Sequence, residues 1–141
     1  MVSSSTTACA LAVVAACLCL CCSAQLGVRG GWKKKTNTDD EHYHTLAHLA
    51  ISQQVQGREF YDTVLKVTDV ETQVVAGTNY RITFNTAEST CPISATYSKE
   101  SCLPKTQQVK DTCTAVINEG LGGHETLVRS FTCASSPSSS A

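Results

Sequence analysis

The stretch Gln73-Val74-Val75-Ala76-Gly77 lies between two runs of strand-forming residues and limits how they can pair. Glycine adopts positive φ angles without a Cβ clash, so a tight reversal of the chain is expected at Gly77. The reversal joins the two runs into a hairpin and places Val74, Val75 and Ala76 at its tip. Apolar side chains on an exposed tip indicate a surface that meets another protein. A buried core strand that continues into a turn fits the same segment equally well.

The flanking runs predict the two strands of this first hairpin. Upstream, the run from Phe60 to Val70 is rich in residues that favour strands. Downstream, Tyr80, Ile82 and Phe84 alternate with polar residues, as in an antiparallel strand with one buried face and one wet face.

A second hairpin is expected nearer the C-terminus. Residues 112–117 and 126–132 are typical of strands, and the glycine-rich segment 118–124 between them is typical of a turn. A further short strand is expected between the first two late cysteines, where Ile93, Ala95 and Tyr97 alternate with other residues.

One helix precedes the strands. Thr38-Asp39-Asp40-Glu41 matches a capping box, with Thr38 as the N-cap. Apolar residues at helical spacing form a candidate buried stripe, namely Tyr43, Leu46, Ala47 and Ala50. Gly57 suits the position just beyond a helix C-terminus, so the helix is predicted over residues 39–56. The chain is therefore expected to have an α+β fold, in which a curved antiparallel sheet of four to five strands wraps one long helix.

The two ends of the chain differ in composition from the part expected to fold. Residues 1–24 carry no charge and contain an apolar run that is short for a membrane span, which predicts a signal peptide and a secreted, extracellular protein. A retained anchor acylated on a leader cysteine is the alternative. Residues 25–37 are expected to form a flexible arm in which Lys33-Lys34-Lys35 is a solvated linker run. Residues 38–134 then form the folded domain, and residues 135–141 a disordered serine-rich tail.

The cysteines indicate disulfide bonds. Of nine cysteines, five fall in the predicted leader, which leaves Cys91, Cys102, Cys113 and Cys133. An even number in a secreted chain predicts two disulfides, for which three pairings exist, and pairing of neighbours along the chain is favoured. A zinc site is the competing interpretation, weakened because no C-x-x-C pair is present.

Other functions are not supported by the composition. The net charge of −1 gives no electrostatic reason to expect nucleic acid or a membrane surface as a partner. His44 and His48 could share a metal, but no third ligand is near them, so two partly exposed histidines are expected, with no metal and no other cofactor. A thiol enzyme is not favoured either, because disulfides account better for the four cysteines.

Taken together, the glycine pair Gly30-Gly31, one helix, Gln73–Gly77 in a hairpin and four late cysteines resemble the secreted cystatins. Cystatins are tight, reversible inhibitors of papain-like cysteine proteases. The Gln73–Gly77 stretch fits the family's Q-x-V-x-G pattern, and the resemblance covers essentially the whole mature chain and extends to tick-type cystatins. It also implies two sequential disulfides, Cys91–Cys102 and Cys113–Cys133.

The resemblance implies a mechanism in which three segments plug the protease cleft without presenting a bond for cleavage. The arm occupies non-primed subsites, the first hairpin passes close to the catalytic cysteine, and the second hairpin tip touches the primed side. The residues implied in these contacts are Val28, Arg29, Gly30, Gly31, Gln73, Val74, Val75, Ala76, Gly77, Leu121 and Gly122.

Three positions depart from the family's usual pattern. Leu121-Gly122 stands where relatives usually have Pro-Trp, so cathepsin L-like proteases are expected to be preferred over cathepsins B and H, whose clefts are partly occluded. Arg29 stands where many relatives have an apolar residue, and it suits an acidic subsite better than an apolar one. Gly57 takes the place of an asparagine through which some relatives inhibit legumain, so no legumain inhibition is expected.

These departures leave a second function open. A protein that keeps the cystatin scaffold for another interaction, and has lost protease inhibition, is the alternative. The chain is expected to be a monomer, with a hairpin-exchanged dimer as the other arrangement.

Overall fold

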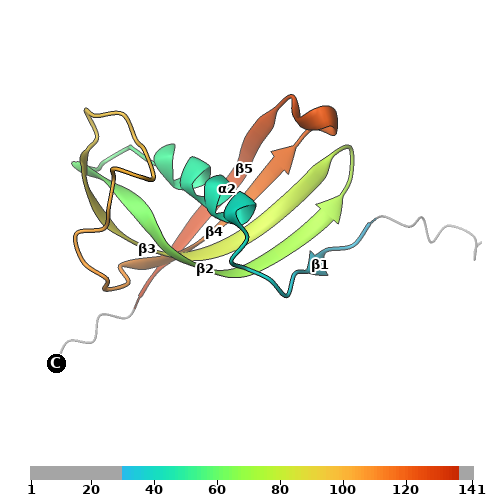
Figure 1. The fold of residues 1–141 in the computed structure, drawn as a ribbon, viewed down its shortest axis with the longest axis horizontal. Coiled ribbons are helices and arrows are strands. Elements are labelled where there is room, and N and C mark those ends of the chain that lie inside the picture. Colours follow the sequence, from blue (N-terminus) through green and yellow to red (C-terminus); the bar gives the residue numbers. More distant parts are fainter. Residues whose placement is uncertain (1–29, 137–141) are drawn as a thin grey trace, which may run out of the picture.

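The computed structural model describes residues 30–136 (Figure 1). The predicted signal peptide lies outside the described residues. So do the first part of the predicted arm, including Val28 and Arg29, and the predicted tail from residue 137 onward.

Within the described range, five strands form one antiparallel sheet, and one α-helix lies across a face of that sheet (Figure 1). Each strand pairs with the next along the chain. The elements are β1 Lys33–Lys34, α2 Glu41–Ser52, β2 Phe60–Val74, β3 Thr78–Pro92, β4 Asp111–Glu119, the 3-10 turn η2 Leu121–Gly123, and β5 Thr126–Ser135. The expected α+β class, with a single helix and an antiparallel sheet, is confirmed. In residues 30–136, no helix has the length and apolarity needed to cross a membrane.

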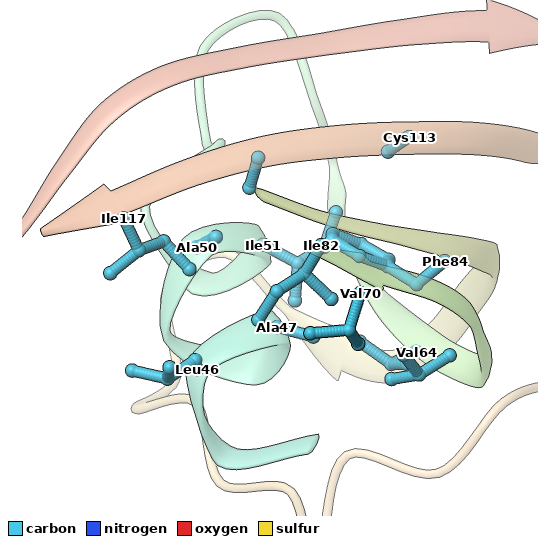
Figure 2. Close-up of a cluster of buried hydrophobic side chains, with 12 residues drawn as sticks. Leu46, Ala47, Ala50, Ile51, Val64, Val70, Ile82, Phe84, Cys113 and Ile117 are labelled. Carbon is cyan, nitrogen blue, oxygen red and sulfur yellow. The ribbon is translucent and has the colours of Figure 1, made fainter. Parts of the chain in front are cut away.

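The core lies between α2 and the sheet (Figure 2). Two alanines, Ala47 and Ala50, are fully buried on the helix, and their small side chains let the sheet approach the helix closely. The other members of the buried cluster are Leu46, Ile51, Val64, Val67, Val70, Ile82, Phe84, Cys113, Ala115 and Ile117. The expected helix stripe is therefore the buried one, with Tyr43 partly buried against the cluster.

The sheet is curved because β2 is irregular. Its pairing with β3 shifts register at three places, between Phe60 and Asp62, between Val64 and Lys66, and between Val67 and Asp69. Such bulges bend a strand and increase its twist. The bent first hairpin follows the helix, and both hairpin tips lie at the same end of the molecule (Figure 1).

The helix is shorter than the predicted 39–56. Its N-cap is Asp40, whose Oδ1 accepts a hydrogen bond of 2.9 Å from the amide of His42, so the predicted capping box on Thr38 is wrong. Glu41 instead pairs with Lys99. The helix ends at Ser52 because the amide of Gln54 bonds to the carbonyl of Ile51, at 3.0 Å, in a tighter turn. Gly57 has φ +73° but lies beyond this end, in the loop that leads to β2.

The strand predicted between Cys91 and Cys102 is absent. Pro92 ends β3. The amide of Ala95 then bonds to the carbonyl of Pro92 in a local turn, at 2.9 Å, and the amide of Ile93 bonds to the carbonyl of Glu59, just before β2, at 2.9 Å. Residues 93–110 form a loop at the opposite end of the sheet from the hairpin tips (Figure 1).

The lysine run is not the solvated linker that its charge suggested. Lys33 and Lys34 form β1, opposite Thr72 and Glu71 of β2, and the amide of Lys35 bonds to the carbonyl of Val70 at 2.8 Å. The lysine side chains are exposed, and Lys34 forms an ion pair of 2.9 Å with Asp69. The described part of the predicted arm is therefore attached to the sheet edge.

Within residues 30–136 there are two disulfides, Cys91–Cys102 and Cys113–Cys133. They have the pairing that the resemblance implies. The first closes the loop that follows β3, and the second joins β4 to β5 at directly opposed positions.

Candidate functional site

The tip of the first hairpin is apolar and exposed. Val74 and Val75 have 74% and 48% of their surface accessible, so the interpretation of this stretch as a buried core strand is wrong. The tip is closed by a hydrogen bond of 3.1 Å from the Val75 amide to the Gly77 carbonyl. Ala76 and Gly77 both have positive φ, at 45° and 106°, which makes the reversal tight.

Gly77 also brings the two hairpins together. A Cβ at this position would lie 2.1 Å from the carbonyl oxygen of Glu119, at the end of β4. No larger residue fits there without moving the backbone of one hairpin away from the other. The two tips therefore touch through their main chains.

The second hairpin tip carries one exposed apolar side chain. Leu121 has 76% of its surface accessible, and it begins the short turn η2. The turn is held by hydrogen bonds from Gly120 to Glu125, at 2.8 Å, and from Gly123 to Gly120, at 3.1 Å. Gly122 has φ +76°, a conformation that a side chain would strain.

A hollow of about 280 Å³ lies between the two tips. It is lined by Val74, Gly77 and Thr78 from the first hairpin and by residues 119–123 from the second. Glu119 is the one ionisable residue among those lining it. An edge of this composition offers apolar side chains and main-chain groups for contact rather than groups for acid–base chemistry.

The start of the described chain lies beside the first tip. A Cβ on Gly30 would come within 3.0 Å of the Val74 carbonyl oxygen, whereas Gly31 has open space around it. Gly30, Val74 and Leu121, which are far apart in the sequence, are thus gathered along one edge of the molecule. Val28 and Arg29 would precede this point but lie outside the described residues.

A row of amide side chains crosses the sheet directly behind this edge. Asn118 Nδ2 donates to Asn79 Oδ1 at 2.7 Å, and Asn79 Nδ2 donates to Gln73 Oε1 at 3.3 Å. The row links β4, β3 and β2, and so connects the second hairpin to the first residue of the tip motif. The sequence analysis did not predict this row, although its three residues occupy outward-facing positions that alternate with inward-facing ones along their strands.

The helix supports the second hairpin from the other side of the sheet. His42 Nε2 lies 3.0 Å from Glu119 Oε2, and the His42 ring packs edge-on against Tyr80 at 5.4 Å between centroids. Burial, together with the charge of Glu119, raises the pKa of Tyr80 to about 12. These contacts were not predicted, because His42 and Glu119 are far apart in the sequence.

His44 and His48 are both partly exposed, as expected. His48 also makes a side-chain contact within the fold. Its Nδ1 lies 2.5 Å from Tyr97 Oη, which in turn lies 3.0 Å from Thr63 Oγ1. Burial lowers the pKa of His48 to about 4, with the positive charge of Lys99 acting in the same direction. Across residues 30–136, no group of three or more His, Cys, Asp or Glu side chains is arranged to hold a metal ion.

Comparison with known proteins identifies the class to which this fold and edge belong. Residues 31–122 match the cystatin domain, and the chain belongs to the cystatin family. Members of this family inhibit cysteine proteases and are not enzymes.

Within the family, the chain is a cystatin of the tick type. It is 46% identical over 114 residues to salivary cystatin-L2 of Ixodes scapularis, which covers 79% of this chain and 86% of that protein. It is 51% identical over 90 residues to mialostatin of Ixodes ricinus, which covers 62% of this chain and 64% of that protein.

Solved structures agree. The crystal structure of mialostatin, a gut cystatin of the hard tick Ixodes ricinus, matches with a TM-score of 0.72 and 44% identity. The match covers 75% of this chain and 99% of that one. That of a salivary cystatin from the soft tick Ornithodoros moubata matches with a TM-score of 0.71 and 45% identity, over 74% and 97%. The protein is secreted and extracellular. Its relatives include salivary and gut cystatins, and its two disulfides are typical of an extracellular protein.

Proposed function

We propose that this protein inhibits papain-like proteases of the cathepsin L type by inserting the edge described above into their active-site cleft. Gly30 and Gly31 lie along the non-primed side, with Val28 and Arg29 ahead of them in the subsites. Gln73, Val74, Val75, Ala76 and Gly77 sit over the catalytic cysteine. Leu121 and Gly122 contact the primed side.

One observation carries this proposal. Two apolar side chains, Val74 and Leu121, are the most exposed large hydrophobic residues of the described chain, and both belong to the rim of one hollow between the hairpin tips. Exposed apolar groups gathered at one edge, on a rigid sheet, are typical of a surface that binds a partner. Gly30 lies against the same rim, so a narrow wedge is available to enter a cleft.

The wedge needs all of its parts. Burying roughly 300 Å² of apolar tip contributes about 7 kcal/mol at 25 cal/mol per Å². Association itself costs on the order of 4–15 kcal/mol, so one hairpin alone binds weakly. Tight inhibition therefore depends on the arm and the second tip acting together with the first hairpin.

The composition of the second tip favours open clefts. Leucine buries less area than the tryptophan that relatives usually place here, because a tryptophan contributes about 150–250 Å². A weaker primed-side contact lowers affinity most for proteases with partly occluded clefts, because the inhibitor must first displace the protease segment that occludes the cleft. Cathepsin L-like enzymes present no such barrier, so the remaining contacts suffice for them.

The test is an inhibition panel with the secreted protein against cathepsins L, S, C, B and H and legumain. We expect tight inhibition of cathepsin L, weaker inhibition of cathepsins B and H, and none of legumain, because Gly57 offers no side chain to that enzyme. Absence of inhibition of every papain-like protease at micromolar concentrations would refute the proposal and favour the interaction-protein alternative.

A further inference from the structure

Trp32 stacks on an arginine of the sheet. Its ring lies beneath the guanidinium of Arg81, with 4.0 Å between Arg81 Cζ and the ring centroid. Arg81 Nη1 in turn donates to Glu71 Oε2 at 2.8 Å. The three side chains come from the segment before β1, from β3 and from β2, so they connect the N-terminal arm to two central strands.

The charge arrangement suits this stack. A guanidinium over the face of an indole is attracted by the ring's electron density, and its flat shape allows close contact. Glu71 lies directly opposite Arg81 in the β2–β3 pairing and holds the guanidinium in place from the side. Arg81 can therefore hold the ring without rearranging.

The stack lies where the arm most needs support. Within the described residues of the arm, main-chain pairing to the sheet runs through Lys33, Lys34 and the amide of Lys35. Gly30, which lies against Val74, is two residues before Trp32 and has no side chain of its own to anchor it. Followed from the sheet toward the N-terminus, Trp32 is the last residue with a side chain before Gly31 and Gly30. It can therefore fix the direction in which these glycines leave the sheet.

We propose that Trp32, held by Arg81 and Glu71, is a positioning residue that directs the inhibitory arm along the first hairpin. This inference rests on the function proposed above. Gly30 and Gly31 are pre-aligned in the free protein, so less conformational freedom is lost when they enter a cleft.

Trp32 is the single tryptophan of the chain, so its fluorescence reports the stack directly. In the free secreted protein, Arg81→Ala should make Trp32 emission more sensitive to acrylamide quenching, because one ring face is uncovered. Lys66→Ala is the matched control, since it removes an exposed positive charge from β2 at a distance from the arm, and it should leave quenching unchanged.

The second measurement is dissociation from cathepsin L. Trp32→Ala and Arg81→Ala should each dissociate about two- to fivefold faster than the parent, as expected for loss of an exposed cation–π contact. Trp32→Phe keeps a ring for the guanidinium and should restore most of the parental rate. Lys33→Ala, in the same short strand with an exposed side chain, should match the parent.

The outcomes separate this inference from the proposed function. Quenching that does not change in Arg81→Ala refutes the stack, and parental dissociation of Trp32→Ala refutes its positioning role, in both cases with inhibition by the parent intact. A parent protein that inhibits no papain-like protease refutes the proposed function and the positioning role together, while the quenching comparison still decides whether the stack exists.

Discussion

Gly77 is the residue on which the shape of the edge depends most. Its φ of +106° disfavours any side chain, and a Cβ there would overlap the Glu119 carbonyl oxygen. Its requirement for glycine was predictable from the hairpin alone. Its second role, the close approach of the other hairpin, was not, because that contact joins segments that are distant in the sequence.

Gly77→Ala should therefore both destabilise the protein and weaken inhibition. Backbone strain at such a position costs about 1–3 kcal/mol, and separation of the tips widens the wedge. Gly31→Ala is the control for stability, because nothing lies within 4 Å of its added Cβ, and its free energy of unfolding should change by less than about 0.5 kcal/mol. Urea unfolding of both variants measures the difference; equal stability would contradict the packing described here.

His48 should make the protein less stable in acid. Its pKa is about 4 in the folded protein, against an ordinary value of 6.5, chiefly because it is buried. Between these two values the unfolded chain binds a proton that the folded chain does not, so this contribution to stability is lost as the pH falls from 6.5 to about 4.

The check is urea unfolding of the parent and His48→Gln at pH 7 and pH 4. Glutamine can still accept a hydrogen bond from Tyr97 but does not titrate. The parent should lose more free energy of unfolding than the variant between the two pH values, by on the order of 1–2 kcal/mol after allowance for solvent screening. Parallel losses in both proteins would show that His48 is not the cause.

At the scale of elements, periodicity predicted the long elements and failed at the short ones. The helix stripe and the alternation in β3 reflect burial against one core, which is why both were visible in the sequence. β1 was missed because it is two lysines long and is held by main-chain pairing that leaves no apolar pattern. Ile93, Ala95 and Tyr97 imitated a strand although they lie in a loop: Ile93 and Tyr97 are partly buried, with Tyr97 reaching His48 and Thr63, and Ala95 is exposed.

The second hairpin should contribute measurably through Leu121. This side chain is almost free of contacts with its own fold, so Leu121→Ala should leave the free energy of unfolding unchanged. Loss of roughly 1.5 kcal/mol of apolar burial in the complex corresponds to about tenfold weaker inhibition of cathepsin L. Leu103→Ala is the matched control, with 57% of its surface exposed at the far end of the sheet, and it should inhibit like the parent. Equal inhibition by both variants would remove the second tip from the binding edge.

For the whole molecule, the sequence motifs indicated which segments matter but not how the fold holds them together. The glycine pair, Gln73–Gly77 and Leu121 were singled out from their chemistry. The amide row from Asn118 to Gln73, the His42–Glu119 contact and the Trp32 stack all depend on strand register and on helix placement. Long-range pairings of this kind leave no local signal, so they became visible only in the structure.

The central claim is that an apolar edge, held rigidly outside the core, enters a protease cleft. The most direct measurement compares inhibition of cathepsin L by the parent, by Gln73→Ala/Val75→Asp and by Leu103→Asp, with thermal unfolding of each. The account predicts that the double variant inhibits far more weakly, that Leu103→Asp inhibits like the parent, and that all three unfold at similar temperatures. Inhibition by the double variant equal to that of the parent would contradict it.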